Sequence, residues 1–269
     1  MAMNMYDLAG RKALVSGGAQ GLGAGMAEAL VRAGASVAIG DIQAEAGRTV
    51  AQDLQKTGGT AMFVPLDVTD DAGWESAVAS VVDELGGLDI VVNNAGVEIS
   101  GLVVDLDPAA TRRMLDVNVL GVALGIKHAF RAMRPGGAAG RGGAIVNVSS
   151  VAATIPFPGI AGYAATKSAV DRLTRVAALE SGKLGYGVRV NCLYPGLVPT
   201  EMGVGLARDM EALGLWPSAE AAVGDVVGRT PLGRLGEVGD MADAVVFLAS
   251  DAARFITGAG LPVDGGMGM

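Results

Sequence analysis

The sequence predicts an α/β protein built on a Rossmann-like, doubly wound parallel sheet. Short apolar runs alternate along the chain with longer segments of helical period, which is typical of βα units. A glycine-rich loop follows the first apolar run, and an aspartate follows the second. These two features favour the open sheet over a closed eight-fold βα barrel, the main structural alternative. We therefore expect a single domain with a seven-stranded parallel sheet and helices on both faces.

The apolar runs are continuous rather than alternating, as expected for strands that are covered on both faces. The expected strands are Lys12–Ser16, Ser36–Gly40, Ala61–Pro65, Asp89–Asn93, Ala144–Ser149, Val188–Leu193 and Gly260–Val263. The segments between them carry apolar residues at helical spacing with polar residues opposite. The expected helices are Leu22–Ala33, Ala44–Lys56, Asp71–Leu85, Pro108–Met133, Tyr163–Ser181 and Glu237–Ser250.

One segment, residues 197–236, breaks this alternation. It is longer than a connection requires, and long excursions in compact domains are often lids or binding loops. Its large apolar side chains are Met202, Leu206, Met210, Leu213, Leu215 and Trp216. No linker, repeat or charge block marks a domain boundary. We expect residues 1–269 to form one domain, with residues 197–236 as its substrate loop.

Composition limits the partners that we expect. The 269 residues, 51% of them hydrophobic, are enough for one large core. The formal net charge is -8 and no basic run occurs, so we expect a small-molecule partner, and neither nucleic acid nor a membrane surface. The first residues lack an apolar leader, and no apolar stretch is long enough to span a bilayer. These features predict a cytoplasmic protein.

The sequence lacks the residues of several common kinds of site. Cys192 is the only cysteine, so an internal disulfide and a multi-thiolate metal site are excluded, and we expect no metal. Because Cys192 lies in a strand-like run, it is expected to be a small buried hydrophobe. His128 is the only histidine, and no G-x-S-x-G motif accompanies it, so a hydrolase triad is not expected.

The expected cofactor site begins in the loop after the first strand. Residues 16–23 read S-G-G-A-Q-G-L-G, a G-x-x-x-G-x-G arrangement that opens into a helix. Glycine permits a tight turn and a close backbone approach to a pyrophosphate, and the helix N-terminus presents unpaired N–H groups to that anion. The alternative is an ordinary strand–helix turn. The residues expected to contact a dinucleotide here are Gly17, Gln20, Gly21, Leu22 and Gly23.

Asp41 ends the second strand, 20 residues after Gly21, where a carboxylate can accept hydrogen bonds from the adenosine ribose hydroxyls. It would repel the 2′-phosphate of NADP, and neither Gln20 nor Ile42 supplies a compensating cation. We therefore expect NAD as the cofactor, with Asp41 and Ile42 beside its ribose. The alternative for Asp41 is an aspartate in an exposed turn.

Tyr163 and Lys167 are four residues apart at the start of an expected helix, so both project from one face. A phenol with a pKa near 10 is a poor acid–base group at neutral pH, and a nearby ammonium group is expected to lower that pKa. Ser150 follows the fifth strand, and Asn118 interrupts an apolar helical run. Taken singly, these are more often an amphipathic pair, a cap and a buried hydrogen-bonded amide.

In their joint order along the chain, these motifs resemble those of the short-chain dehydrogenase/reductase family. That family combines the G-x-x-x-G-x-G loop, an Asp-Val pair, an N-N-A-G motif and a Ser…Tyr-x-x-x-Lys set, and all occur here between residues 8 and 266. The resemblance implies that Tyr163 is the general acid/base and that Lys167 also binds the nicotinamide ribose. It selects Ser150 to hold the substrate oxygen, and it makes Asn118 the residue that positions a water between Lys167 and solvent.

The resemblance also implies the remaining cofactor contacts and an assembly. Together with Tyr163 and Lys167, these contacts are Asp67, Val68, Asn94, Ala95, Gly96, Pro195, Gly196, Val198 and Thr200. Two departures from the family pattern occur: Ser16 replaces the usual threonine but keeps a hydroxyl, and Pro199 removes an N–H near the expected nicotinamide contacts. Members commonly form tetramers through the C-terminal end and two helices, so we expect a homotetramer.

These features predict an NAD(H)-dependent oxidoreductase that interconverts a secondary alcohol and a ketone. The apolar residues of 197–236, with Val151, Ile155, Pro156 and Phe157, predict a bulky apolar substrate such as a hydroxysteroid or cyclic alcohol, although core packing explains the same residues. One alternative is a reductase of 3-oxoacyl thioesters on acyl carrier protein that uses NADPH. The other is a non-catalytic dinucleotide-binding protein, which should lack a member of the catalytic set.

Overall fold

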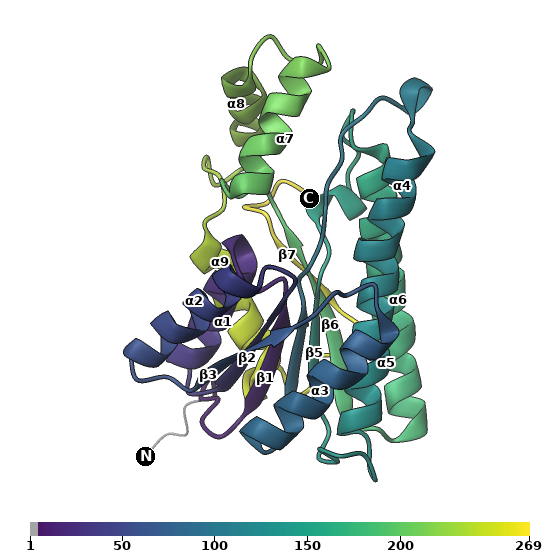
Figure 1. Ribbon diagram of the computed structural model, residues 1–269. Helices are drawn as coiled ribbons and strands as arrows, with labels where there is room; N and C mark the ends of the chain where they lie inside the picture. Colours follow the sequence, from purple (N-terminus) through teal and green to yellow (C-terminus); the bar gives the residue numbers. More distant parts are fainter. Residues whose placement is uncertain (1–4) are drawn as a thin grey trace.

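The computed structural model describes residues 5–269, and the strands within this range form one parallel sheet. The strand order is β3-β2-β1-β4-β5-β6-β7. The strands are β1 (Lys12–Ser16), β2 (Ser36–Asp41), β3 (Ala61–Pro65), β4 (Ile90–Asn93), β5 (Gly143–Val148), β6 (Val188–Pro195) and β7 (Gly260–Val263). The sheet has two open edges, so the doubly wound prediction is confirmed and the closed barrel is excluded (Figure 1).

The chain reverses its direction of winding between β1 and β4. β1 pairs with β2 on one side and with β4 on the other, and Ser16 lies opposite both Gly40 and Asn93. In open α/β sheets, such a reversal leaves a crevice beyond the carboxyl ends of the central strands, and ligands bind in it. The topology therefore places the loops after β1 and β4 side by side at this crevice.

Helices cover both faces of the sheet (Figure 1). Their bounds are α1 (Gly21–Arg32), α2 (Ala44–Lys56), α3 (Asp71–Leu85), α4 (Pro108–Leu115), α5 (Gly121–Met133), α6 (Ala161–Leu184), α7 (Glu201–Ala212), α8 (Ala219–Arg229) and α9 (Val238–Ala249). Side chains of α1, α2 and α9 share a buried cluster with one face of the sheet. Those of α3, α5 and α6 form the cluster on the other face, around the fully buried Trp74.

Two helical regions differ from the sequence prediction. The expected helix Pro108–Met133 consists of α4 and α5 joined by a π-helical turn, η2 (Asp116–Leu120). The expected loop at residues 197–236 contains the helices α7 and α8. α6 begins at Ala161, so Tyr163 lies in its first turn.

The α7–α8 pair stands beyond the carboxyl edge of the sheet, as Figure 1 shows at the top of the molecule. A third, smaller apolar cluster holds it there, in which Met210 and Ala222 pack with Ile160 near the start of α6. Because of this packing, apolar side chains of α7 and α8 cover the crevice. Within residues 5–269, no helix is both long enough and apolar enough to cross a lipid bilayer.

Candidate active site

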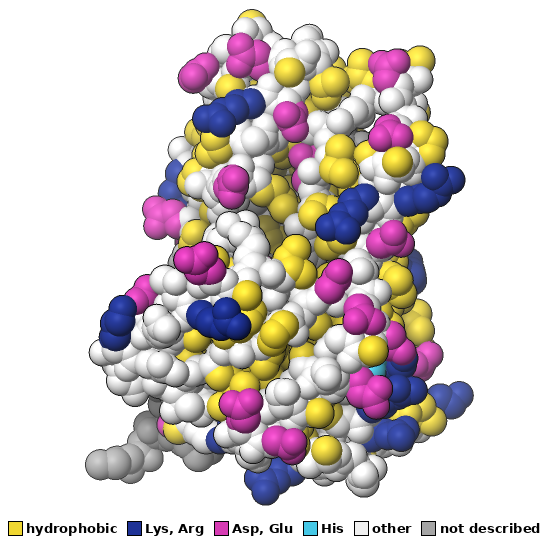
Figure 2. All heavy atoms as spheres, viewed as in Figure 1, with side chains coloured by type: hydrophobic (Ala, Val, Ile, Leu, Met, Phe, Trp, Pro, Cys, Tyr) yellow, Lys and Arg dark blue, Asp and Glu magenta, His cyan; other side chains and the backbone are white. Residues whose placement is uncertain are grey.

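A cavity of about 460 Å³ opens at the carboxyl ends of the strands. Residues that directly follow each strand from β1 to β6 line it, and Figure 2 shows the surface hollowed below the α7–α8 pair. Every site residue predicted from the sequence lines this cavity except Gly23 and Asn118, which lie behind its wall. Residues far apart in the sequence are thus brought to one place by the sheet.

The loop after β1 and the first turn of α1 are packed so closely that one residue in each has to be glycine. Gly17 has a φ of +64°, and a Cβ there would lie 2.7 Å from the Cα of Ala95. A Cβ on Gly23 would clash with the carbonyl oxygen of Gly17. Asn94 donates from its side chain to the carbonyl oxygens of Ser16 and Gly17, at 3.2 and 3.0 Å. These contacts hold the loops after β1 and β4 together, and the two loops form one wall of the cavity.

The Ser16 hydroxyl also connects these two loops. Its oxygen accepts hydrogen bonds from the backbone N–H groups of Asn94 and Ala95, at 3.1 and 3.3 Å. The departure from the family's threonine therefore leaves a working hydroxyl at this position.

The N-terminus of α1 lies at the same wall of the cavity and has no side-chain cap. Gln20 precedes the helix in an extended conformation and makes no capping hydrogen bond, so the first N–H groups of the helix stay available to an anion. Asp41, only 7% exposed, accepts from the N–H groups of Ala19 and Gln43, both at 3.0 Å. Because each carboxylate oxygen has a second lone pair, Asp41 can still accept hydrogen bonds from ribose hydroxyls.

These residues fit a dinucleotide cofactor. The cradle is bare backbone that a Cβ would fill, a helix N-terminus lies beside it, and a buried carboxylate lies where a ribose would be. Ile42 and Gln43 continue the cavity wall next to Asp41, and neither carries a positive charge. Farther along, Asp67 accepts from the backbone and side chain of Thr69, which lowers the pKa of its carboxyl group.

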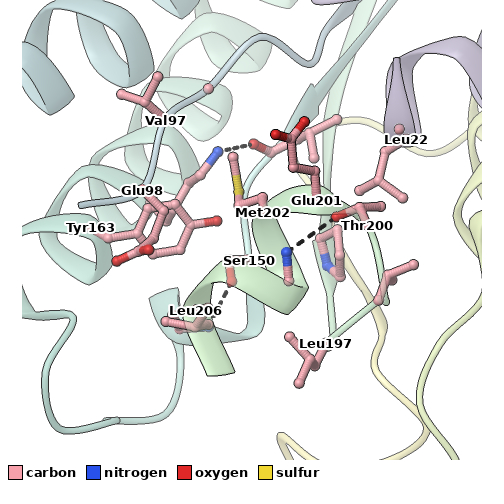
Figure 3. Close-up of a pocket in the computed structure, with 18 of the residues that line it drawn as sticks. Leu22, Val97, Glu98, Ser150, Tyr163, Leu197, Thr200, Glu201, Met202 and Leu206 are labelled. Carbon is pink, nitrogen blue, oxygen red and sulfur yellow. Dashed lines mark hydrogen bonds between the residues drawn. The ribbon is translucent and has the colours of Figure 1, made fainter. Parts of the chain in front are cut away.

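Ser150, Tyr163 and Lys167 meet at the inner end of the cavity. The Ser150 hydroxyl and the Tyr163 side chain face each other in the cavity (Figure 3), and the Ser150 hydroxyl lowers the pKa of Tyr163. The Lys167 ammonium lies 5.5 Å from the centre of the Tyr163 ring and donates to the carbonyl oxygen of Val148 at 2.9 Å. The neighbouring Ser149 hydroxyl instead donates to the carbonyl oxygen of Lys167 at 2.8 Å. Ser149 therefore anchors α6 to β5, while Ser150 has its hydroxyl in the cavity.

The expectation that Lys167 lowers the pKa of Tyr163 is wrong for the chain without ligands. Burial raises the pKa of Tyr163 to about 12, the Ser150 hydroxyl lowers it and the Glu98 carboxylate raises it further. Burial also lowers the pKa of Lys167 to about 8. Burial is the largest cause for both groups, because desolvation penalises the charged form of each.

Asn118 lies in the π-helical turn η2 and is fully buried. Its side-chain oxygen accepts from the Val97 N–H at 2.8 Å, and its side-chain nitrogen donates to the Val97 carbonyl oxygen at 2.8 Å and to the Thr166 hydroxyl at 3.0 Å. The amide therefore joins the loop after β4 to α6, the helix that carries Tyr163 and Lys167. This is the buried, hydrogen-bonded asparagine that the residues alone suggested.

The end of β6 and the segment after it line another part of the cavity. Pro195, Gly196, Val198 and Thr200 all line it, as expected. The Thr200 hydroxyl caps α7 by accepting from the Gly203 N–H at 3.3 Å, and the Thr200 N–H donates to the Val198 carbonyl oxygen at 2.7 Å. Pro199 stands between these bonded residues, so the local backbone is fixed without the N–H that it lacks.

Apolar side chains line the outer part of the cavity, but not all the expected ones. Val151 and Phe157 line it, whereas Ile155 and Pro156 do not, since Pro156 is exposed and the chain turns away there. From residues 197–236, the cavity receives Met202, Leu206, Met210 and Trp216, while Leu213 and Leu215 pack into the cluster behind it.

Sequence analysis missed several charged residues of the wall. Glu98 and Glu201 line the cavity, as does Arg113 from α4, which acts on Asp67. The one signal for Glu98 was a charge between two apolar residues directly after the N-N-A-G motif. The single cysteine and the single histidine lie elsewhere: Cys192 is buried in β6, and His128 contacts Asp71 at 2.7 Å.

Comparison with known proteins identifies relatives along the whole chain. A family model described as enoyl-(acyl carrier protein) reductase matches residues 17–268. The trans-4-hydroxycyclohexanecarboxylate dehydrogenase of Sinomonas cyclohexanicum is 39% identical over 96% of this chain and 93% of its own. A 2,5-dichloro-2,5-cyclohexadiene-1,4-diol dehydrogenase of Sphingobium indicum is 38% identical over 96% of each chain. The 3-alpha-(or 20-beta)-hydroxysteroid dehydrogenase of Mycobacterium tuberculosis is 41% identical over 96% of this chain and 90% of its own.

Solved structures share the fold over almost their full length. A putative short-chain alcohol dehydrogenase from Sinorhizobium meliloti matches with a TM-score of 0.88 and 35% identity, covering 98% of both chains. A gluconate 5-dehydrogenase from Burkholderia cenocepacia, solved in complex with NADP and tartrate, matches with a TM-score of 0.87 and 33% identity, covering 99% of this chain and 98% of that chain.

Proposed function

Because the chain belongs to the short-chain dehydrogenase/reductase family, we propose that it is an NAD(H)-dependent oxidoreductase that interconverts a secondary alcohol and a ketone on a cyclic substrate. The observation that carries this proposal is the meeting of Ser150, Tyr163 and Lys167 at the inner end of a cavity whose other end fits a dinucleotide. Relatives named for cyclohexane, cyclohexadiene and steroid substrates support a cyclic substrate. The apolar outer wall supports it as well.

In this mechanism Tyr163 moves the proton and Ser150 holds the oxygen. A bound nicotinamide dinucleotide supplies the redox chemistry, taking hydride from the carbinol carbon or returning it. For ketone reduction, the neutral Tyr163 phenol donates its proton to the substrate oxygen while the Ser150 hydroxyl stabilises the developing negative charge. The high pKa of Tyr163, about 12, keeps that phenol protonated at neutral pH. Oxidation needs the reverse transfer, so its rate should rise with pH.

Two buried residues support Tyr163 from behind. Lys167, 3% exposed, has its ammonium beside the phenol ring, and its hydrogen bond to the Val148 carbonyl oxygen holds it in place for the proposed contact with the nicotinamide ribose. Asn118 joins the loop after β4 to α6 and so positions the turn that carries Tyr163 and Lys167. We retain the role in a water relay for Asn118 as part of the proposal, since its Oδ1 and the Lys167 Nζ both lie close to Gly96.

The first experiment is an absorbance assay of NAD(H) turnover over a panel of cyclic and acyclic secondary alcohols and ketones. On any substrate so identified, Tyr163→Phe should lower kcat by at least about a hundredfold, the usual contribution of a general acid or base. Tyr186→Phe is the matched control, because Tyr186 packs against Phe130 outside the cavity. Full activity of Tyr163→Phe would contradict the assigned role.

The proposed preference for NAD rests on Asp41 and on its uncharged neighbours. Comparison of kcat/KM with NAD and NADP should favour NAD. Ile42→Arg should raise kcat/KM with NADP by about tenfold, because an arginine beside this ribose can bind the 2′-phosphate. Ile42, 65% exposed, has room for the longer side chain. Ile42→Gln, which adds length but no charge, is the control, and an equal gain in both variants would contradict the electrostatic argument.

The description of the family model makes thioester reduction a second candidate. It predicts NADPH oxidation with acetoacetyl or crotonyl thioesters and little turnover of simple cyclic alcohols. The same panel should therefore include these thioesters, and their clear preference with NADPH would replace the proposal. If no substrate is turned over although NADH binds, the non-catalytic alternative holds.

We further propose that the protein is a cytoplasmic homotetramer that binds a small molecule and needs neither nucleic acid nor a membrane. The family resemblance supports the tetramer, and the acidic net charge of -8 supports the small-molecule partner.

A further inference from the structure

Glu98 places a carboxylate in the wall of the cavity close to Tyr163. It follows Gly96 by two residues, in the loop after β4, and its side chain is half-buried. Figure 3 shows it beside the Tyr163 ring, and both residues line the cavity. Its charge raises the pKa of Tyr163, so the two groups lie close enough to interact.

Few groups of the protein offset the negative charge of the Glu98 carboxylate. Within residues 5–269, its one hydrogen-bond donor is the Ser100 hydroxyl, which reaches Oε1 at 2.9 Å, and no cation lies within ion-pair distance. The exposed Asp209 on α7 adds negative charge nearby. Burying a charge without a partner costs free energy, and a ligand that donates a hydrogen bond would recover part of it.

The surroundings of Glu98 leave few other polar partners for a substrate. Phe157, Ile160, Met202, Leu206 and Trp216 line the outer cavity with apolar atoms. Glu201 also lines the cavity, but Glu98 is the carboxylate whose charge acts on Tyr163, so it is the acidic group that a bound substrate meets near the proposed reacting carbon. A carboxylate accepts hydrogen bonds only, and it repels anions.

We propose that Glu98 is a specificity residue that accepts a hydrogen bond from a second hydroxyl of the substrate, so that the preferred substrates are neutral cyclic diols and the matching hydroxyketones. This inference rests on the proposed alcohol–ketone function and names its substrate class. The reacting hydroxyl binds Ser150 and Tyr163, the ring packs against the apolar wall, and the second hydroxyl donates to Glu98. A carboxylate in place of that second hydroxyl is disfavoured.

The test compares kcat/KM with NAD for cyclohexanol, the 1,2-, 1,3- and 1,4-cyclohexanediols, 4-aminocyclohexanol and 4-hydroxycyclohexanecarboxylate. The unmodified protein should favour at least one diol over cyclohexanol by at least about tenfold, the usual effect of a hydrogen bond to a charged group. Glu98→Leu should bring that ratio close to one, and Glu98→Gln, which keeps a carbonyl acceptor, should give an intermediate ratio. Asp209→Asn removes a nearby charge outside the cavity, and the ratio should stay within about twofold.

A second readout separates this inference from the proposed function. Calorimetry in the presence of NADH measures diol and cyclohexanol binding directly, and NADH binding reports that each variant is folded. Absence of any alcohol turnover would refute the proposed function, while tighter diol binding that depends on Glu98 would still support the inference. Equal losses for diol and cyclohexanol in Glu98→Leu would overturn it. Preference for the carboxylate, or for the amine without any Glu98-dependent diol preference, would overturn it as well.

Discussion

At the scale of single residues, burial controls the ionisation of the two central groups. Lys167 and Tyr163 are both enclosed, and burial shifts the pKa of each in the direction that favours its neutral form. The site thus holds a lysine that loses its proton far more easily than usual. An ionisable group that is kept in such a position despite this cost is typical of functional sites.

Lys167→Met should therefore stabilise the ligand-free protein at pH 7 while it abolishes turnover. Burial lowers the pKa of Lys167 from 10.5 to about 8, which corresponds to a destabilisation of roughly 3 kcal/mol while the folded protein holds the charge. The hydrogen bond to the Val148 carbonyl oxygen is lost in the variant and offsets part of this gain.

The pH dependence of the free energy of unfolding shows whether the lowered pKa of Lys167 causes this difference in stability. Between about pH 8 and 10.5, the unfolded chain keeps a proton on Lys167 that the folded protein has lost, so the free energy of unfolding rises with pH. The variant lacks this rise, so its advantage should shrink as the pH approaches 10. Thermal unfolding of both proteins between pH 6.5 and 10 measures it. If the difference in stability between the two proteins did not change with pH, the lowered pKa of Lys167 would not be its cause.

At the scale of secondary-structure elements, the π-helical turn η2 is what places Asn118. A π-turn widens the helix by one residue and is often found at functional sites. Here it lets a helix residue reach both backbone groups of Val97 and the Thr166 hydroxyl. The helix pair α4–α5 is thereby tied to the loop that carries Glu98.

Asn118→Leu should lower the free energy of unfolding by about 3 kcal/mol, because it leaves the partly buried Val97 N–H and carbonyl without partners. Urea unfolding measures this loss. Thr166→Val is the matched comparison, since it removes one of the three hydrogen bonds to Asn118 and should cost clearly less. Similar losses in the two variants would mean that the bonds to Val97 contribute little.

The α7–α8 pair shows why an element can be missed in the sequence. These helices have 12 and 11 residues and contain Gly203, Gly205, Gly224 and Gly228, which weaken the helical signal. Only packing in the small cluster around Met210 and Ile160 makes them stable helices. Their position over the cavity follows from that packing.

At the scale of the whole molecule, exposed apolar side chains fit the expected tetramer. On α6, Val176, Leu179 and Leu184 are 46%, 71% and 60% exposed, and Phe255 before β7 is fully exposed. The family resemblance implies assembly through the C-terminal end and two helices, and these exposed residues lie on a helix and just before the C-terminal strand. Apolar groups left in contact with water in one chain are stabilised when a second copy covers them.

Light scattering should therefore give about four times the 26.9 kDa of one chain. Leu179→Arg should reduce this mass, since it puts a charge into an apolar contact. Val104→Arg replaces an 86% exposed residue on another element and should leave the mass unchanged. A monomeric mass for the unmodified protein would contradict the tetramer.

The sequence by itself determined the sheet, the helices that flank it and most of the residues that line the candidate site. Continuous apolar runs specify buried parallel strands, and motifs such as the glycine loop and Tyr163-x-x-x-Lys167 depend on local spacing, which a sequence displays directly. The strand ends were predicted to within one or two residues. The largest difference is in β6, which extends to Pro195 because its last residues pair with β7.

Only the tertiary structure decided the ionisation of the site and the charge that faces the substrate. Whether Lys167 lowers the pKa of Tyr163 depends on how much water burial removes, and burial is a property of the packed protein. Glu98 stood in the sequence as one more charge after a strand, and only the fold brought it beside Tyr163. Through-space electrostatics depends on distance and solvent exposure, neither of which is carried by the order of residues.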